Sequence, residues 1–218
     1  MLLAERLRHR FGAVTALDDV SFTVQPGQTL AVFGPNGAGK TTLLKVLAGL
    51  IHPQGGRAHL DGGRRAIGWI GHQPQLYAQL TVLENLRFWA SLYDVPLPPD
   101  LLSRLGLAEH AGRSVRSLSR GLVQRVAIAR ALVHDPAVLL LDEPFTGLDR
   151  TAAEAFSRLL AQHAAAGRAS VLVTHNVEEG TGLATEVAFM RAGRFVQLAP
   201  RGARGPAQVA EDYRNAIA

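Results

Sequence analysis

The feature that most constrains the fold of this chain is a glycine-rich loop between an apolar stretch and a helical one. The loop, Gly34-Pro35-Asn36-Gly37-Ala38-Gly39-Lys40-Thr41, matches the phosphate-binding pattern G-x-x-x-x-G-K-[ST]. It follows a buried strand that we predict over residues 29–33 and precedes a helix predicted from about residue 40 to residue 50. A strand, a loop and a helix in this order are typical of an α/β sheet.

Each residue type in the loop suits a nucleoside triphosphate. Glycines let the backbone amides turn inward as an anion nest, and the following helix adds its positive N-terminal end. Lys40 supplies a point charge for the outer phosphates, Thr41 a hydroxyl for Mg²⁺, and Thr42 an amide for an inner phosphate. The alternative is a chance glycine-rich turn, and the strand before it and the helix after it argue against that.

A pair of acids follows a second apolar strand. Residues 137–141 are all apolar and lead directly into Asp142 and Glu143. Ligands of α/β sheets bind at the carboxyl ends of the strands, so both acids are expected at that edge. We predict that Asp142 holds Mg²⁺, through a water molecule, and that Glu143 orients or deprotonates the attacking water. The alternative role for such acids is helix capping.

The remaining pattern alternates strands with helices. Pro96, Pro98 and Pro99 interrupt the helical stretch, and Asp100 is expected to cap the helix after them. Apolar strands separated by helices predict a mainly parallel sheet covered on both faces. We expect further strands at 21–24, 57–61, 65–71, 170–173, 187–190 and 194–198, and helices within 82–133, at 151–166 and from about 176.

Composition narrows the class of protein. The chain has no cysteine, which excludes disulfides, zinc–thiolate sites and cysteine nucleophiles. No apolar run reaches the length of a membrane-spanning helix, and the first residues lack the layout of a secretion signal, so a cytosolic protein is expected. The net charge is +5, but no basic run is interleaved with aromatic residues, so nucleic acid is not a predicted partner.

Three further segments resemble one known family. Leu118-Ser119-Arg120-Gly121-Leu122, with the helical residues 124–132 behind it, is similar to the signature region of ABC-transporter ATPases. Residues 146–149 resemble the family's D-loop, and residues 170–175 resemble the strand that leads to its switch histidine. The order of these motifs agrees with the family, and together they cover nearly the whole chain. In the family pattern LSGGQ, this chain has Arg120 and Leu122 in place of the first glycine and the glutamine.

The resemblance implies a fold and a mechanism. It implies a P-loop NTPase core with an antiparallel β subdomain (residues 1–75 and 134–200), a helical signature subdomain (76–133) and a C-terminal tail (201–218) without a readable motif. Two copies would face each other head to tail around two ATP molecules, with Ser119 and Gly121 of one copy contacting the γ-phosphate held by the other. His175 would contact the same phosphate, and Phe11 would stack on adenine, unless its ring is ordinary core packing.

The glutamine that this family places near Mg²⁺ has two candidates here. Aligning the downstream residues without gaps puts His72 at that position, and Gln73 is its neighbour. We choose Gln73, because an amide oxygen suits the hard Mg²⁺ ion better than imidazole does. A polar loop residue without any ligand role is the other interpretation.

The resemblance also implies partners. A chain of this family would power transport through separate transmembrane permease subunits, from the cytoplasmic face of the membrane. Residues 71–74 and 83–88 are similar to the haem-exporter ATPase of cytochrome c maturation, although drug and polysaccharide exporters share much of this pattern. The other classes considered are a soluble ABC ATPase of DNA repair or translation, and a P-loop GTPase or nucleotide kinase. The chain has no N-K-x-D motif for guanine.

Overall fold

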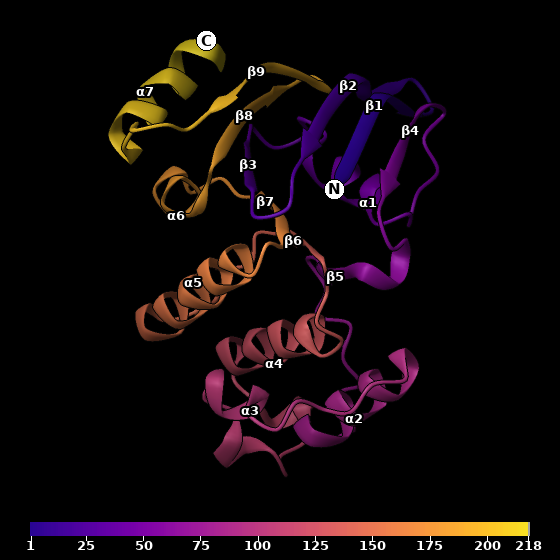
Figure 1. Ribbon diagram of the computed structural model, residues 1–218, viewed down its shortest axis with the longest axis vertical. Coiled ribbons are helices and arrows are strands. Elements are labelled where there is room, and N and C mark those ends of the chain that lie inside the picture. Colours follow the sequence, from indigo (N-terminus) through magenta and orange to yellow (C-terminus); the bar gives the residue numbers. More distant parts are fainter. Residues whose placement is uncertain (218) are drawn as a thin grey trace.

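The computed structural model describes residues 1–217, which form two β-sheets flanked by helices (Figure 1). The strands are β1 Leu2–Phe11, β2 Val14–Val24, β3 Thr29–Phe33, β4 Gly55–Leu60, β5 Ile67–Ile70, β6 Val138–Asp142, β7 Ala169–Val173, β8 Glu186–Arg191 and β9 Arg194–Pro200. The helices are α1 Lys40–Leu47, α2 Val82–Tyr93, α3 Leu101–Arg104, α4 Arg120–Leu132, α5 Arg150–Ala165, α6 Val177–Leu183 and α7 Pro206–Ile217. Single turns of 3₁₀ helix occur at Arg64–Ala66, Ala108–His110 and Val115–Ser117.

The larger sheet has six strands in the order β5-β6-β7-β3-β8-β9. The first five are parallel to one another, and only β9 pairs antiparallel, with β8. Every residue of β3, β6 and β7 is buried, which explains why each of these strands is apolar at all but one position. The prediction of a mainly parallel α/β sheet is confirmed.

The smaller sheet is antiparallel, with the order β2-β1-β4. Helix α1 contacts β2 and β4 of this sheet as well as β6 and β7 of the larger one, so it fills the space between the two. The apolar side chains of α1, among them Leu43 and Leu44, are fully buried in the cluster that joins both sheets. This packing fixes the start of α1, and with it the glycine-rich loop, against the sheet.

The other face of the larger sheet is covered by α5, α6 and α7, and α7 occupies the part of the chain for which we predicted no motif. Pro206 stands at its first position, where the missing amide hydrogen costs nothing. Val209 is fully buried, and the Tyr213 ring packs edge-on against Phe189 at 5.5 Å between ring centroids. Helix α7 therefore packs on the folded core through Val209 and Tyr213.

Residues 82–132 contain three α-helices, two single turns of 3₁₀ helix and no strand, and they lie together below the two sheets in Figure 1. Helix α2 begins with a capping box, in which the Thr81 hydroxyl accepts from the Glu84 amide and the Glu84 carboxylate accepts from the Thr81 amide. Asp100 stands at the N-cap position of α3 as expected, but the expected capping bond is wrong. Its backbone is helical (φ −93°, ψ −6°), its side chain makes no capping bond, and its carboxylate lies 3.7 Å from the Arg104 guanidinium. No helix among residues 1–217 is both long and apolar enough to cross a membrane.

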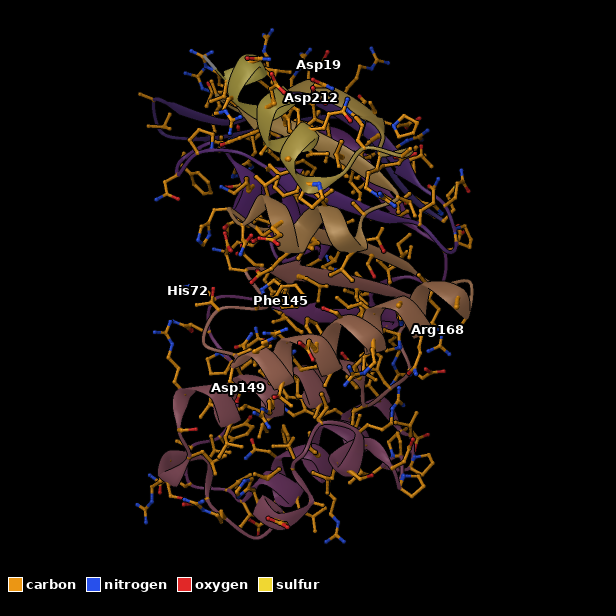
Figure 2. The ribbon with its side chains drawn as sticks, turned by 90° about the vertical axis from the view of Figure 1, so that its left-hand side faces the viewer. Asp19, His72, Phe145, Asp149, Arg168 and Asp212 are labelled. Atoms are coloured by element: carbon orange, nitrogen blue, oxygen red, sulfur yellow. The ribbon has the colours of Figure 1, made fainter. Side chains whose placement is uncertain are left out.

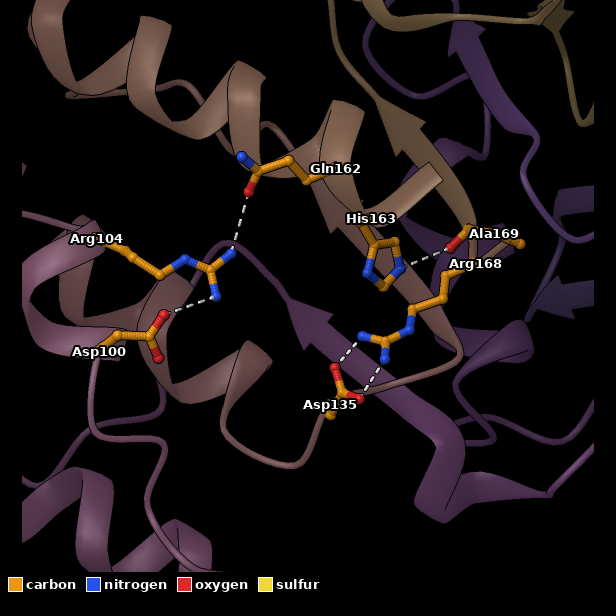
Figure 3. A network of polar contacts seen from close by, with 7 residues as sticks. All are labelled: Asp100, Arg104, Asp135, Gln162, His163, Arg168 and Ala169. Carbon is orange, nitrogen blue, oxygen red and sulfur yellow. Dashed lines mark hydrogen bonds and ion pairs between the residues drawn. The ribbon is translucent and has the colours of Figure 1, made fainter. Parts of the chain in front are cut away.

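A polar network joins the helical segment to the sheet (Figure 3). Arg104 of α3 donates to the Gln162 side chain of α5 at 3.3 Å, and Arg168, just after α5, pairs with Asp135 just before β6. Between these pairs lies His163, which is buried and whose Nε2 lies 3.3 Å from the Ala169 carbonyl oxygen. Burial, reinforced by the charge of Arg168, lowers the pKa of His163 to about 4.

This histidine should make the stability of the fold depend on acidity. In the unfolded chain a histidine has a pKa of about 6.5, so between pH 6.5 and pH 4 the unfolded state binds the additional proton. We expect the free energy of unfolding to fall by about 3 kcal/mol more in the wild type than in H163Q over this interval. Urea unfolding at a series of pH values measures the difference. H52Q, at an exposed position, is the control, and parallel curves for H163Q and the wild type would contradict the prediction.

Candidate functional site

The glycine-rich loop is held by close backbone contacts at two of its glycines. Gly39 has a φ of +106°, and a Cβ at this position would collide with the carbonyl oxygen of Ala16. A Cβ on Gly34 would collide with the carbonyl oxygen of Met190 in β8. The loop therefore takes its shape from a strand of each sheet, and these two positions require glycine.

Lys40 points back into the loop that it follows. Its ammonium donates to the carbonyl oxygens of Gly34 and Pro35 at 2.7 and 3.0 Å, and the residue is only 8% exposed. Burial lowers the pKa of Lys40, and the nearby carboxylates of Glu143 and Asp142 oppose this effect. Two backbone oxygens therefore fix the Lys40 ammonium at the N-terminus of α1.

The loop borders a cavity of about 490 Å³. Its walls combine backbone amides at the start of a helix, two lysines and two carboxylates, a donor set that fits a polyanion together with a cation. The lining residues are Val14, Ala16, Asn36, Gly37, Ala38, Gly39, Lys40, Thr41, Thr42, Lys45, His72, Asp142 and Glu143. A larger hollow of about 660 Å³, between α1 and β4, contains neither a phosphate loop nor an acid pair of this kind.

Two oxygen ligands for a hard cation meet in this cavity. The Thr41 hydroxyl donates to Oδ2 of Asp142 at 2.9 Å. Burial raises the pKa of Asp142, and this hydrogen bond partly offsets the rise. Among residues 1–217, no group of three or more His, Cys, Asp or Glu side chains could hold a metal by itself. A two-oxygen site fits Mg²⁺, which in nucleotide sites keeps water and phosphate ligands.

Both candidates for the glutamine position lie near Asp142. Gln73 lines a side cavity of about 350 Å³ together with Thr41 and Asp142. His72 lines that cavity, the main cavity and a third one of about 220 Å³ that also reaches Glu143. The positive charge of a protonated His72 would act to lower the pKa of Asp142. His72 thus reaches further into the site than the Gln73 that we chose.

Glu143 is held by groups from the neighbouring strand. Its backbone has a φ of +50°, and its amide donates to the carbonyl oxygen of Val173 at 2.9 Å. Oε1 lies 2.9 Å from Nδ1 of His175, and Oε2 accepts a hydrogen bond from the Thr174 hydroxyl at 3.1 Å. Sequence reasoning singled out Glu143 and His175 but missed Thr174. The sequence feature that could have indicated Thr174 is its position, directly before His175 at the end of a parallel strand.

The signature segment lies outside the main cavity. Ser119 caps α4, with its hydroxyl accepting from the Leu122 amide at 3.4 Å, and Gly121 lies so close to Gly147 that a Cβ would be 2.8 Å from the carbonyl oxygen. Helix α4 is tied to the same loop by an ion pair of 2.6 Å between Arg125 and Asp149. Figure 2 shows His72 and Asp149 on one side of the molecule and Arg168 on the other.

The structure therefore does not bring every predicted residue together. Ser119 and Gly121 do not line the cavity beside the phosphate loop of their own chain. Arg120 lines the third cavity, with His72 and Glu143 on its other walls. Phe11 is 53% exposed and contacts the His9 ring edge-on at 4.7 Å; Val14, which sequence reasoning missed, lines the main cavity instead.

Comparison with known proteins identifies a family with these features. A protein-family model described as ABC transporter matches residues 17–146. The sulfate/thiosulfate import ATP-binding protein CysA of Xanthomonas campestris is 38% identical over 88% of the chain, and the Nod factor export ATP-binding protein I of Ralstonia nicotianae is 36% identical over 90%. The chain spans 62% and 66% of the lengths of these two relatives.

Solved structures have the same architecture. One described as the ATP-binding subunit of an ABC transporter has a TM-score of 0.92 and 28% identity, with 100% of both chains covered. The dimeric post-hydrolysis state of the ATP-binding cassette MJ0796, bound to ADP and Pi, has a TM-score of 0.83 and 26% identity. It covers 94% of this chain and 100% of that one.

The loop glycines give a direct test of the site. G39A places a side chain in the left-handed region and against the Ala16 carbonyl, so we expect it to lower the free energy of unfolding by more than about 3 kcal/mol and to abolish binding of a fluorescent triphosphate. G37A is the matched control: its φ is also positive (+81°), but nothing lies within 4 Å of a Cβ, so only about 1 kcal/mol of backbone strain is expected. Equal losses in the two variants would contradict the assigned collision.

Proposed function

The chain belongs to the ABC transporter family, and from this premise we propose that it is the ATP-binding and ATP-hydrolysing subunit of a transporter. The observation that carries the proposal is the meeting, in one cavity, of the phosphate loop, the Thr41–Asp142 oxygen pair and Glu143. Each of these groups serves one part of phosphoryl transfer: holding the phosphates, holding the metal and activating water.

Binding would use groups that are already in position. The loop amides and the N-terminus of α1 receive the phosphate oxygens, and the Lys40 ammonium exchanges its carbonyl partners for them. Thr41 and Asp142 would hold Mg²⁺, with Gln73 or His72 beside them. The ion, when bound, would neutralise charge on the outer phosphates.

Hydrolysis would then proceed from Glu143. Its carboxylate accepts a proton from water as the water oxygen bonds to the γ-phosphorus and the bond to ADP breaks. The His175 ring, 2.9 Å from Oε1, orients this carboxylate and is exposed enough to reach the γ-phosphate as well. General-base catalysis of this kind contributes about 10²- to 10⁴-fold.

The signature segment requires a second copy in this proposal. Ser119 and Gly121 do not line the cavity of their own chain, so they would act on nucleotide that a partner chain holds. The N-terminus of α4, a helix of 13 residues, would then bring its amides and the Ser119 hydroxyl to the γ-phosphate. The likeness to a dimeric cassette bound to ADP and Pi supports a head-to-tail dimer that closes on ATP.

The proposed partners are transmembrane permease subunits that hold the chain at the cytoplasmic face of the membrane. The relatives named above include one importer, of sulfate or thiosulfate, and one exporter, of Nod factor. Neither is named for haem, so the haem-export prediction rests on residues 71–74 and 83–88 alone. Identifying the permease that co-purifies with the chain from a membrane extract tests both the partner and the cargo class.

Removal of the loop cation should weaken nucleotide binding. A hydrogen bond between charged groups contributes about 1.5–3 kcal/mol, so K40A should raise the Kd for ATP by about ten- to a hundredfold, measured by titration with a fluorescent ATP analogue. K45A removes the other lysine of the same cavity and leaves the bonds of Lys40 to the loop carbonyls in place, so it should have a smaller effect. An unchanged Kd for ATP in K40A would contradict the assignment of the glycine-rich loop as the phosphate-binding site.

Removal of the base should separate binding from turnover. E143Q keeps the shape of the side chain, so ATP affinity should be retained while hydrolysis falls by about a hundredfold or more. With ATP bound and not consumed, the variant should elute as a dimer in size-exclusion chromatography with light scattering. E178Q makes the same exchange at an exposed position of α6 and should hydrolyse like the wild type. Full hydrolysis by E143Q would discard Glu143 as the base.

A further inference from the structure

The Thr174 hydroxyl is engaged on both sides. It donates to Oε2 of Glu143 at 3.1 Å and accepts a hydrogen bond from the Asn176 amide, also at 3.1 Å. The residue is 2% exposed, so water does not compete for these bonds. The Asn176 amide can only donate and the ionised Glu143 carboxylate can only accept, so the hydroxyl proton is directed toward Glu143.

The rest of the Thr174 side chain fixes the direction of that hydroxyl. A Cβ on Gly180 would lie 3.0 Å from Cγ2 of Thr174 and 2.6 Å from the Phe33 ring, so the methyl group and the ring lie close to the bare backbone of Gly180. Threonine is branched at Cβ and has few χ1 rotamers. Packing of the methyl group therefore determines where the hydroxyl points.

Glu143 is consequently held at both oxygens by adjacent residues of one strand end. His175 contacts Oε1 and Thr174 contacts Oε2. A carboxylate has about four lone-pair positions, so these two contacts leave others free to accept a proton. The His175 side chain is 74% exposed, whereas Thr174 is buried, so the threonine is the contact that water does not reach.

We propose that Thr174 is a positioning residue for hydrolysis, which aims the Glu143 carboxylate at the attacking water through its hydrogen bond to Oε2. The inference rests on the proposed function, since it requires Glu143 to be the base. Thr174 does not line the cavity around the phosphate loop, so it acts on turnover and not on the binding of ATP.

The first test compares hydrolysis with binding. T174V replaces the hydroxyl by a methyl group of similar size; we expect kcat to fall by about tenfold or more, with the KM and Kd for ATP unchanged. T181V is the matched control. Thr181, on the neighbouring helix α6, is also a buried threonine, but its hydroxyl has no hydrogen-bond partner among residues 1–217. Its kcat should equal that of the wild type. An unaffected kcat in T174V would overturn the proposal.

The second test holds even where T174V folds poorly. T174S and T174A both lack the methyl group and differ from each other only in the hydroxyl, so a positioning role predicts that T174S turns over ATP about tenfold faster than T174A. Equal kcat values in these two variants would show that Thr174 acts by packing alone. Absence of hydrolysis in the wild type itself would refute the proposed function instead, so the two failures are distinguishable.

Discussion

The parallel register of β3, β6 and β7 is the constraint on which the site depends. Val32 pairs with Val173, and Val173 pairs with Asp142, so all three strands end at the same level of the sheet. The residues that follow them are the phosphate loop, Glu143, and Thr174 with His175. A shift of one strand by a single residue would turn its side chains to the opposite face and separate the base from its supports.

The signature residues at the start of helix α4 do not reach the phosphate loop at the end of β3 in the same chain. Helix α4 is joined to the chain around Gly147 by the Arg125–Asp149 ion pair and by a bond from the Gln124 side chain to the Pro144 carbonyl at 2.8 Å. These contacts run to the segment directly after the acid pair. Under the proposed function, a second copy that contacts this segment would therefore influence the position of Glu143 and of the signature residues together, because both adjoin the same segment.

What could be predicted from the sequence was local in the chain. The phosphate loop and the acid pair are contiguous motifs beside apolar strands, and the parallel sheet follows from those strands. Thr174 was missed because its partner, Glu143, lies on another strand, and no spacing reveals a bond across a sheet. Asp100 lies at the predicted N-cap position, but its side chain does not cap the helix, because its backbone adopts helical angles. Helix α7 was missed because no sequence motif marks it. It is recognised from its packing on Phe189, which lies on a strand earlier in the chain.

Lys40 has a consequence for how nucleotide would enter. Its ammonium is already desolvated and bound to two carbonyl oxygens of the loop. Capture of a triphosphate then requires neither the recruitment of a side chain from solvent nor the loss of its rotamer freedom, because that ordering is complete beforehand. Entry becomes an exchange of acceptors around one stationary cation, which favours rapid loading and lets the pocket keep its shape between successive turnovers.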